Sequence, residues 1–411
     1  MNMLEKAKAK LQKYNQLKML NILEKLYGEN KEKLAEDILE TDIEQIMDLY
    51  KNKNNKKLVK DIIEPIEYID KNLLSKKELE TFSNLGKEII ENGEYAVITL
   101  AGGQGTRLGF DGPKGTFKLD IGNGKYIFEI FVDNLKKAKK QYGREIYWYI
   151  MTSKENHKDT VDFFEKHNYF GYDKNKIKFF SQTFLPVIDM EGNLLVNNNY
   201  EIKKASDGNG AIYKSLKIQG ILEDMKQKNI KWVYIANVDN IMAKIVDDVF
   251  LGLAIKNNLQ SAWKAVAKDF PEEKVGVFCK RNGKFSVIEY IDMSENMIYA
   301  KKENGEPLYN ESNIGNYLIR FDALEKLTTC NLQYHCANKK NSYIDENLNE
   351  IIPTEPNTYK FETFIFDGFD YLEDIMVMRV LRDEEFAPIK NATGVDSPET
   401  AIQKYNKYNK A

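Results

Sequence analysis

A short apolar run that passes directly into a glycine-rich loop constrains this chain more than any other feature. Residues 96–100 (AVITL) carry no charge, which is typical of a strand buried on both faces of a parallel sheet. The loop that follows, residues 102–109 (GGQGTRLG), lets backbone N–H groups approach a ligand where side chains would clash. Arg107 and Lys114 place two cations beside it. The stretch therefore predicts a binding site for a polyphosphate.

Two well-known phosphate motifs do not fit this loop. The P-loop requires two glycines separated by four residues and followed by Lys and Ser or Thr, and no register here provides that. The dinucleotide fingerprint requires a third glycine three residues after the second, where this chain has Leu108. A tight strand-to-helix turn with incidental charges is the simplest alternative, but so much glycine beside two cations serves no packing purpose. We therefore favour a phosphate-binding loop of another type.

Composition limits the partners and the location of the chain. Its 411 residues exceed one comfortable core, so about two or three domains are expected. The net charge is −3 with 30% charged residues, which argues against nucleic acid as a partner. No apolar run reaches membrane-spanning length and the N-terminus is too charged for a signal peptide, so we expect a cytoplasmic protein without a membrane partner. With only three cysteines and three histidines, the chain is not expected to have a disulfide framework, a zinc site or histidine-based catalysis.

The first 93 residues are predicted to be helical. Apolar residues recur at helical spacing, as in residues 4–11 (LEKAKAKL). Residues 75–78 (SKKE) form a capping box that opens a further helix, and Gly93 ends it. Residues 51–57 (KNKNNKK) are interpreted as a solvated linker rather than an anion site.

From Tyr95 onward strands alternate with helices, which is the pattern of a parallel α/β sheet. The predicted strands cover residues 96–100, 146–151, 177–180 and 232–236, and the predicted helices cover residues 126–140, 155–167 and 211–228. In such sheets ligands bind beyond the carboxyl ends of the strands. The glycine loop, Thr152 and Gln182 all follow a predicted strand, so we expect them at that edge of the sheet.

Two further polar segments adjoin these elements. Residues 207–210 (DGNG) precede the helix predicted at 211–228, where free N–H groups suit a ribose or phosphate, although a bare turn would have the same sequence. Asp239 follows the strand predicted at 232–236, where an acidic residue can cap a helix or bind a metal. Beside two phosphate-binding loops the metal is favoured, because Mg²⁺ is typically held by one or two carboxylates plus substrate phosphate oxygens.

Beyond Ser261 the strands are predicted to form hairpins, with a turn at residues 281–284 (RNGK). The segments VGV, VIEY and NESNI in this region supply Gly276, Glu289 and Asn313. Asn and Glu side chains suit sugar hydroxyls because they offer well-placed hydrogen-bonding groups. Taken singly, each is more simply explained as a surface turn residue.

Several motifs, in order, resemble those of one enzyme family. LAGGQGTRLG followed by PKG, FFSQ, DGNG, VDN, VGV, VIEY, NESNI, FIFD and PIKN is similar to the UDP-N-acetylglucosamine pyrophosphorylases, a branch of the UDP-sugar pyrophosphorylases. The resemblance runs from about Tyr95 to Thr400. It implies an α/β fold of the Rossmann-like nucleotidyltransferase (GT-A-like) type, with a mixed sheet flanked by helices. The expected parts are an N-terminal helical region (1–93), a central nucleotide-sugar transferase domain (94–370) and a short C-terminal segment (371–411).

The resemblance also implies roles for individual residues. Arg107 and Lys114 would bind the departing pyrophosphate, Lys390 would bind the sugar phosphate, and Asp239 would carry Mg²⁺. The residues expected to bind the nucleotide are Leu100, Ala101, Gly102, Gly103, Gly105, Thr106, Gly208 and, at the uracil edge, Gln182. Those expected to bind the sugar are Asn209, Gly276, Glu289, Tyr290, Asn313 and, beside the N-acetyl group, Phe364 and Phe366.

Two features depart from the family pattern. Members of the eukaryotic type continue past the PLKN-like motif into a C-terminal domain that contributes to dimer contacts, whereas this sequence stops at Ala411, so a monomer is expected. The sugar motif usually reads NAGNI and here reads NESNI, so the sugar-side loops need not keep the selectivity of the family.

The implied reaction converts UTP and N-acetylglucosamine 1-phosphate into UDP-N-acetylglucosamine and pyrophosphate. A sugar-phosphate oxygen attacks the α-phosphorus in line with the departing pyrophosphate. The second pKa of a phosphomonoester is about 6, so this nucleophile is largely ionised at neutral pH and needs no general base. Catalysis then depends on positioning and electrostatics, supplied by the three cations and Mg²⁺.

Three other functions compete with this interpretation. A UDP-glucose or broad-specificity UDP-sugar pyrophosphorylase shares the glycine loop and its lysine. A glycosyltransferase that uses a UDP-sugar would call for an Asp-x-Asp metal motif, but Val238-Asp239-Asn240 has one acid only and PKG would be unexplained. A nucleotide-binding sensor without catalysis is disfavoured by the joint presence of the three cations and Asp239.

Overall fold

The structure is a computed structural model that describes residues 1–53 and 61–410. The chain divides into two compact units, and each is assembled from three separate stretches. Unit 1 comprises Met1–Lys60, Thr183–Ala211 and Asn331–Ile365, and unit 2 comprises Asp61–Gln182, Ile212–Cys330 and Phe366–Ala411. Of the linker predicted at residues 51–57, residues 54–57 lie outside the described part of the chain.

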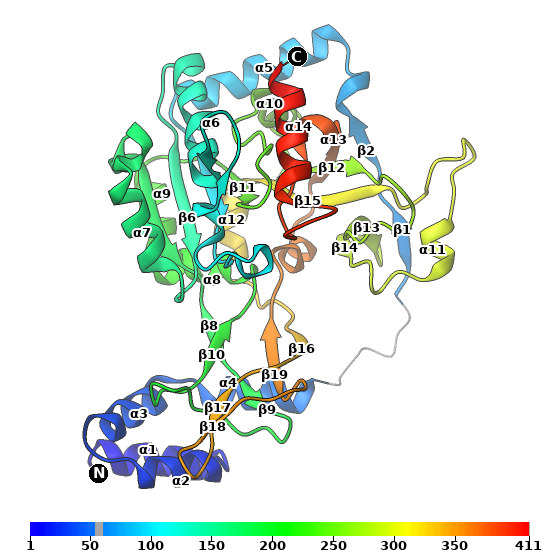
Figure 1. Cartoon of the computed structure of the whole chain (residues 1–411). Helices are drawn as coiled ribbons and strands as arrows, with labels where there is room; N and C mark the ends of the chain where they lie inside the picture. The colour runs from blue at the N-terminus through cyan, green and yellow to red at the C-terminus, as the bar shows by residue number, and fades with distance from the viewer. Residues whose placement is uncertain (54–60, 411) are drawn as a thin grey trace. The chain divides into compact units, whose positions relative to one another are not determined.

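Unit 2 is built on a large mixed sheet, drawn in Figure 1. The order of neighbouring strands is β2 (Tyr68–Asp70), β20 (Ile375–Arg379), β12 (Ser261–Ala267), β15 (Glu311–Arg320), β11 (Trp232–Asn237), β3 (Tyr95–Leu100), β6 (Tyr147–Thr152) and β7 (Ile177–Ser181). Beside β15 the sheet is extended by β13 (Val277–Arg281), which pairs with β14 (Lys284–Ile288) and β1 (Ile63–Pro65). β15 is antiparallel to both neighbours and the other pairs along the main order are parallel. This architecture confirms the mixed α/β sheet predicted from the sequence.

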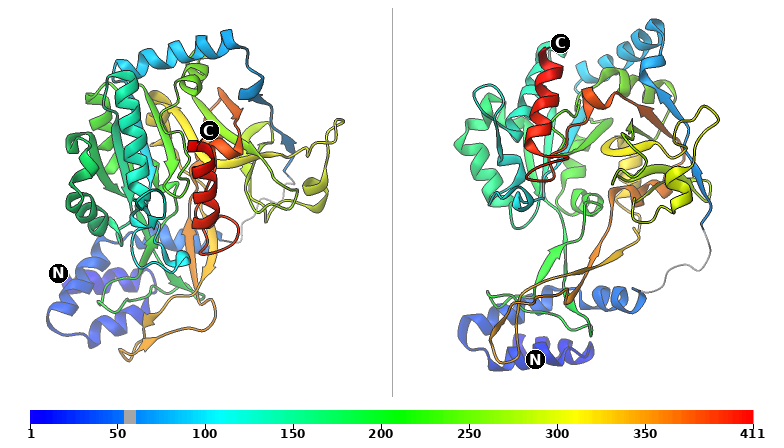
Figure 2. Two further views of the ribbon diagram at one scale, coloured as in Figure 1. Left: turned by 45° about the horizontal axis from the view of Figure 1, so that its top comes forward. Right: turned by 45° about the vertical axis from the view of Figure 1, so that its right-hand side comes forward.

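Helices cover the sheet in unit 2. They are α5 (Lys76–Glu91), α6 (Ile127–Tyr142), α7 (His157–Lys166), α8 (Ala211–Ile218), α9 (Ile221–Gln227), α10 (Asp248–Lys256), α11 (Glu295–Tyr299), α12 (Phe321–Leu327), α13 (Arg382–Glu385) and α14 (Pro398–Lys410). The two rotated views in Figure 2 show α14, in red, running beside α6. A small hairpin joins β4 (Lys118–Leu119) to β5 (Lys125–Tyr126). Among the described residues, no helix is both long and apolar enough to cross a membrane.

The central strand β3 is buried along its whole length because both faces of the sheet are covered. Successive residues of a strand point to opposite faces. On β6, the ring of Trp148 packs parallel to that of Phe131 of α6, whereas the hydroxyl of Tyr149 donates to Asp224 of α9 over 2.7 Å. α6 and α9 therefore lie on opposite faces, and every residue of β3 is buried between two layers of helices.

Unit 1 combines the N-terminal helices with short strands. The helices are α1 (Met3–Lys13), α2 (Leu17–Lys25), α3 (Gly28–Glu40) and α4 (Ile43–Asn52), and the strands are β8 (Phe184–Pro186), β9 (Ile188–Asp189), β10 (Lys204–Ser206), β16 (His335–Lys339), β17 (Tyr343–Ile344), β18 (Glu350–Ile351) and β19 (Thr358–Glu362). Leu11, Ile38, Ile188 and Phe361 belong to one hydrophobic cluster of this unit. The N-terminal helices thus share a core with segments from two distant parts of the chain.

Most predicted elements are confirmed, and two need correction. The capping box of residues 75–78 opens α5, and β13 and β14 form the predicted antiparallel hairpin. The single helix predicted over residues 211–228 is wrong, because the chain breaks into α8 and α9 at Gly220, which has φ +68°. The stretch predicted as helical up to residue 93 also contains β1 and β2. These strands form by pairing with β13 and β20 far along the chain, so local patterns do not reveal them.

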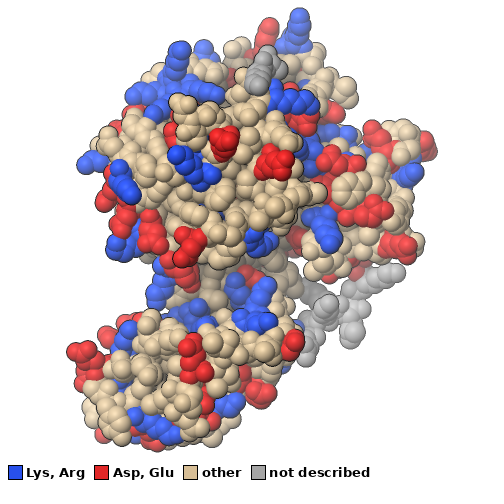
Figure 3. Space-filling view, viewed as in Figure 1, with Lys and Arg blue, Asp and Glu red and all other residues tan. Residues whose placement is uncertain are grey.

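Charged side chains of both signs are mixed on the molecular surface. On the face seen in Figure 3, Lys and Arg side chains are interspersed with Asp and Glu side chains over each unit. This mixture agrees with the small net charge of −3.

Candidate active site

The candidate site of unit 2 lies where the order of strands in the sheet reverses. β6 and β7 follow on one side of β3, and β11 lies on the other side. These strands are parallel, so their carboxyl ends share one edge of the sheet. The N–H of Val238 donates to the carbonyl oxygen of Leu100 over 3.1 Å, which keeps together the segments that leave β11 and β3. Such a switch point is where open α/β sheets bind ligands.

The glycine loop folds back on itself after β3. The N–H of Gly105 donates to the carbonyl oxygen of Gly112 over 2.9 Å. The N–H of Lys114 donates to the carbonyl oxygen of Gly103 over 3.1 Å. These bonds bring Lys114 beside Gly103. Gly103 is exposed, and a Cβ there would meet no atom within 4 Å. Packing within the described residues therefore does not require glycine at this position, whereas close approach of a ligand to the backbone would.

Gln182 lies against the start of this loop. Its N–H donates to the carbonyl oxygen of Thr152 over 2.8 Å, at the ends of β7 and β6. Its buried carboxamide is so close to Gly102 that a Cβ there would lie 2.8 Å from Nε2. The structure therefore brings together the residue predicted at the uracil edge and the loop predicted to bind the nucleotide. A carboxamide carries both a donor and an acceptor, as does the edge of a uracil ring.

Asn156 supports the loop, and sequence reasoning missed it. Its fully buried Nδ2 donates to the carbonyl oxygens of Ala101 over 3.0 Å and Gly103 over 3.4 Å. Its Oδ1 accepts from the N–H of Ser153 over 2.7 Å. The only local signal was an Asn directly before a helix, which suggests an N-cap. Its side chain makes no capping bond to α7 and fixes the path of the glycine loop instead.

Lys114 is the centre of a group of charged residues. It is half-buried, and its Nζ donates to the carbonyl oxygen of Ile389 over 3.2 Å. Burial lowers the pKa of Lys114, and the charges of Arg107 and Lys390 lower it further. The carboxylate of Asp239 acts in the opposite direction. The structure thus brings the predicted phosphate-binding cations and the predicted metal ligand into one electrostatic environment.

Residues 385–390, here named the 385–390 segment, run along the residues that follow β11. The N–H of Ile389 donates to the carbonyl oxygen of Asp239 over 2.9 Å, and the N–H of Ala387 donates to Oδ1 of Asn240 over 2.9 Å. Because the carbonyl oxygen of Ile389 also accepts from Lys114, this segment joins the glycine loop to Asp239.

Lys390 ends the segment. Its Nζ lies 3.3 Å from Oδ2 of Asp396, and its side chain is 37% exposed. An exposed cation with a half-buried carboxylate partner can exchange that partner for a phosphate at little cost.

A second group of predicted residues gathers just before β13, just after β14 and on β15. The N–H of Asn313 donates to the carbonyl oxygen of Gly276 over 2.8 Å, and a Cβ on Gly276 would lie 3.0 Å from Oε1 of Glu289. Oδ1 of Asn313 accepts from the hydroxyl of Tyr317 over 2.8 Å. Burial raises the pKa of Tyr317, and the nearby charge of Glu289 contributes, so its hydroxyl stays a donor. Tyr290, the next residue after Glu289, is 42% exposed.

Gly208 and Asn209 lie in unit 1. Gly208 has φ +89°, and a Cβ there would lie 2.1 Å from the carbonyl oxygen of Thr363, so only glycine fits. Oδ1 of Asn209 accepts from the N–H of Ile365 over 3.0 Å. The DGNG segment is therefore anchored on residues 363–365 of the same unit.

Phe364 and Phe366 flank the point where the chain passes from one unit to the other. Unit 1 ends at Ile365, and unit 2 resumes at Phe366. The ring of Phe364 lies 4.9 Å from that of His335 within unit 1. Phe366 is half-buried in the 3₁₀ turn Ile365–Tyr371. Their shared role at an N-acetyl group stays a prediction.

Comparison with known proteins identifies the family. The family model described as UTP–glucose-1-phosphate uridylyltransferase (UDPGP) matches residues 42–396. The chain belongs to this family. It is 40% identical to UDP-N-acetylglucosamine pyrophosphorylase of Saccharomyces cerevisiae, over 81% of this chain and 72% of the yeast protein. It is 36% identical to UDP-N-acetylhexosamine pyrophosphorylase-like protein 1 of Xenopus tropicalis, over 79% of this chain and 66% of that protein.

A solved structure has the same fold. The uridine diphosphate N-acetylglucosamine pyrophosphorylase of Trypanosoma brucei, crystallised with an inhibitor, matches with a TM-score of 0.84 at 28% identity. The match covers 98% of this chain and 84% of that structure. The family predicted from the sequence motifs is thereby confirmed. This chain spans slightly less than two thirds of the Xenopus relative and a larger share of the yeast protein.

Asp239 is the candidate metal ligand of this UDPGP-family chain. Its carboxylate is half-buried, and no described residue donates a hydrogen bond to it. Within residues 1–53 and 61–410, no group of three or more His, Cys, Asp or Glu side chains is arranged to hold a metal ion. A single available carboxylate next to Lys114 fits Mg²⁺ that takes its other ligands from substrate phosphates and water.

Proposed function

We propose that this chain transfers a uridylyl group from UTP to N-acetylglucosamine 1-phosphate, forming UDP-N-acetylglucosamine and pyrophosphate. The observation that carries the proposal is the meeting of the glycine loop, Lys114, Asp239 and the 385–390 segment at the switch point of the sheet. The yeast and Trypanosoma relatives, both named for UDP-N-acetylglucosamine, support this choice of reaction.

The reaction needs two anions to be held together. An oxygen of the sugar phosphate attacks the α-phosphorus of UTP in line with the departing pyrophosphate. This oxygen is already largely ionised at neutral pH, because the second pKa of a phosphomonoester is about 6. Arg107 and Lys114 stabilise the charge that develops on the pyrophosphate, and Lys390 binds the sugar phosphate. No side chain has to accept a proton in the transfer step.

The other predicted residues bind and orient the two substrates. The nucleotide is bound by Leu100, Ala101, Gly102, Gly103, Gly105, Thr106 and Gly208, with Gln182 at the uracil edge. The N-acetylhexosamine is bound by Asn209, Gly276, Glu289, Tyr290, Asn313, Phe364 and Phe366. The proximity of Gln182 to Gly102 and of Glu289 to Gly276 supports this division into a nucleotide side and a sugar side.

Magnesium completes the proposed site through Asp239. When bound, the ion supplies positive charge that neutralises and orients the triphosphate. The half-buried carboxylate after β11 would hold it, and the charge of Asp239 already acts on Lys114 in the free protein.

A UDP-glucose or broad-specificity UDP-sugar pyrophosphorylase is the second candidate. The description of the family model, which names glucose 1-phosphate, favours it. The relatives at 36–40% identity carry N-acetylglucosamine or N-acetylhexosamine in their names, so the amino sugar is better supported.

Pyrophosphate release with a panel of sugar 1-phosphates tests the proposal. Purified protein is given UTP, Mg²⁺ and either N-acetylglucosamine, N-acetylgalactosamine or glucose 1-phosphate. We expect the highest kcat/KM with N-acetylglucosamine 1-phosphate. Release with glucose 1-phosphate alone would overturn the choice of sugar, and no release with any sugar would favour a nucleotide sensor.

A further inference from the structure

A cluster of charged side chains is buried next to the 385–390 segment and takes no part in the chemistry above. Lys264 of β12 is fully buried, and its Nζ lies 2.7 Å from Oδ2 of Asp247 and 2.5 Å from Oε2 of Glu385. The two carboxylates are 6% and 1% exposed. Lys71 approaches from the side, 3.1 Å from Asp247 and 3.6 Å from Glu385.

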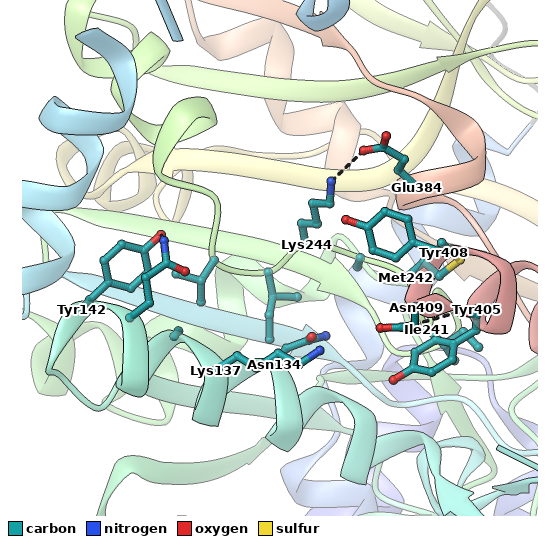
Figure 4. Close-up of a pocket in the computed structure, with 15 residues that line it drawn as sticks. Asn134, Lys137, Tyr142, Ile241, Met242, Lys244, Glu384, Tyr405, Tyr408 and Asn409 are labelled. Carbon is teal, nitrogen blue, oxygen red and sulfur yellow. Dashed lines mark hydrogen bonds and ion pairs between the residues drawn. The ribbon is translucent and has the colours of Figure 1, made fainter. Parts of the chain in front are cut away.

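Lys244 and Glu384 complete this buried ion cluster on its more exposed side. Nζ of Lys244 lies 3.0 Å from Glu384 and 3.7 Å from Glu385. Figure 4 shows Lys244 directed toward Glu384 at the wall of a cavity lined by α6, α14 and residues 241–246. The cluster therefore pairs Lys71, Lys244 and Lys264 with Asp247, Glu384 and Glu385, and its charges balance.

Stability alone does not explain so many buried charges. Moving an ion out of water costs several kcal/mol, and packed apolar residues of the same volume often stabilise a core equally well or better. Burial opposes the charge on both Asp247 and Lys264, yet the facing charges lower the pKa of Asp247 and raise the pKa of Lys264. Asp247 and Lys264 therefore stay ionised, and their attraction holds the start of α10 and β12 in one arrangement.

Glu385 connects this cluster to the backbone of the 385–390 segment. Its carboxylate pairs with Lys264 of β12 and with Lys71. Both lysines also pair with Asp247, which caps the first turn of α10. Its carbonyl oxygen accepts from Nδ2 of Asn240 over 2.8 Å. The start of the segment is therefore anchored in the core of unit 2.

The other end of the segment carries the proposed phosphate contact. Four residues after Glu385, Ile389 is hydrogen-bonded to both Asp239 and Lys114, and Lys390 follows it directly. A shift at the start of this short segment is expected to move its end, because Pro388 and the bonds to residues 239–241 restrict how far the backbone between them can adjust.

We propose that Glu385, held by Lys264, is a positioning residue that fixes the 385–390 segment so that Lys390 meets the sugar phosphate. The inference rests on the proposed uridylyl transfer. Glu385 does not touch a substrate and acts through Lys390. Losing this anchor displaces Lys390, and a misplacement of about 1 Å can lower a rate about 10²-fold.

Two variants remove the anchor in different ways. Glu385→Gln keeps the shape of the side chain and removes its charge. The double variant Lys264→Met/Glu385→Leu replaces the central ion pair with apolar groups of similar size. In the double variant Asp247 keeps Lys71 as its partner and keeps the N–H of Phe250, which donates to its Oδ1 over 3.1 Å. We expect the double variant to fold even if the single variant does not.

Asp224→Asn is the matched control. The carboxylate of Asp224 also faces two lysines, Lys178 at 3.1 Å and Lys228 at 2.7 Å, but it lies on α9, outside the buried ion cluster. Its loss removes a carboxylate that faces two lysines at a more exposed site, 21% exposed, without touching the 385–390 segment.

The kinetic test compares each variant in the wild-type and Lys390→Ala backgrounds. We expect Glu385→Gln and the double variant to unfold cooperatively, to lose about tenfold to hundredfold in kcat/KM for N-acetylglucosamine 1-phosphate, and to bind UTP almost normally. In the Lys390→Ala background they should cause no further loss, because the residue they position is gone. Equal losses in both backgrounds, or wild-type kinetics in the folded double variant, would overturn the proposal.

Amide hydrogen exchange gives a readout that does not depend on activity. Residues 386–390 should exchange faster in both Glu385 variants and at the wild-type rate in Asp224→Asn. Unchanged exchange in the Glu385 variants would overturn the anchoring. Faster exchange in a protein without transferase activity would instead count against the proposed function.

Discussion

Lys114 keeps a positive charge in a half-buried position among other cations. Burial and the charges of Arg107 and Lys390 lower its pKa more than Asp239 raises it, so its charge is only partly compensated in the free protein. A polyphosphate supplies the missing negative charge. Lys114 is therefore expected to stabilise the bound substrate, and to stabilise the charge that develops on pyrophosphate still more strongly.

Replacing Lys114 with alanine should lower turnover while the fold is retained. Electrostatic contacts to a developing charge typically contribute about 10²–10³ in rate, so kcat for pyrophosphate release should fall by about that factor. Steady-state assays give kcat, and circular dichroism with thermal unfolding reports the fold. Lys140→Ala, an exposed lysine on α6, is the control and should be unaffected. Unchanged turnover in a folded Lys114→Ala protein would contradict the assignment.

The pH profile should show the lowered pKa of Lys114. The charged form binds phosphate and is lost as pH rises through the pKa, so kcat/KM for UTP should fall on the alkaline side below the ordinary lysine value of 10.5. Arg107→Gln removes a repelling charge and should raise that pKa. Its profile should therefore have a lower plateau and an alkaline limb shifted to higher pH. A limb that stays in place or moves to lower pH would disagree with this electrostatic account.

At the scale of elements, the glycine loop depends on a helix start for its shape. The strand and loop from Tyr95 to Lys114 were predictable, because an apolar run and dense glycine are local signals. The support from Asn156 was not, because its bonds to Ala101 and Gly103 connect residues 55 and 53 positions apart. The sequence around Asn156 suggests only a helix cap.

Asn156→Ala should both destabilise the protein and weaken UTP binding. The change leaves the carbonyl oxygens of Ala101 and Gly103 and the N–H of Ser153 without this partner, which should cost about 1–3 kcal/mol of unfolding free energy. The freed loop should raise KM for UTP more than KM for the sugar phosphate. Urea unfolding and the two KM values test this, with Asn257→Ala at the end of α10 as control. Equal changes in both KM values would speak against a specific role in shaping the loop.

The 385–390 segment shows the same limit of local prediction. Lys390 was predicted as a phosphate ligand from its motif, but nothing nearby in the sequence indicates how it is held. Its anchor involves Lys264 and Asp247, which are 121 and 138 residues away from Glu385 in the chain. Buried charges that pair across such separations are visible only once the fold is known.

At the scale of the whole molecule, the fold class and family follow from the sequence, whereas the assembly of the units does not. Unit 1 draws on three separate stretches, and its core joins Leu11 of α1 with Ile188 and Phe361. Helical periodicity identifies the apolar face of α1 but not the strands that cover it. The expected division into residues 1–93, 94–370 and 371–411, the monomeric state and the cytoplasmic location stay predictions.

The most direct test of uridylyl transfer follows all phosphorus-containing species at once. Phosphorus NMR of the purified protein with UTP, Mg²⁺ and N-acetylglucosamine 1-phosphate should show UDP-N-acetylglucosamine and pyrophosphate forming in equal amounts. A chelator should stop the reaction if Asp239 holds a required metal, and Lys114→Ala should slow it strongly. Hydrolysis of UTP without transfer, or unchanged substrates over many hours, would contradict the account.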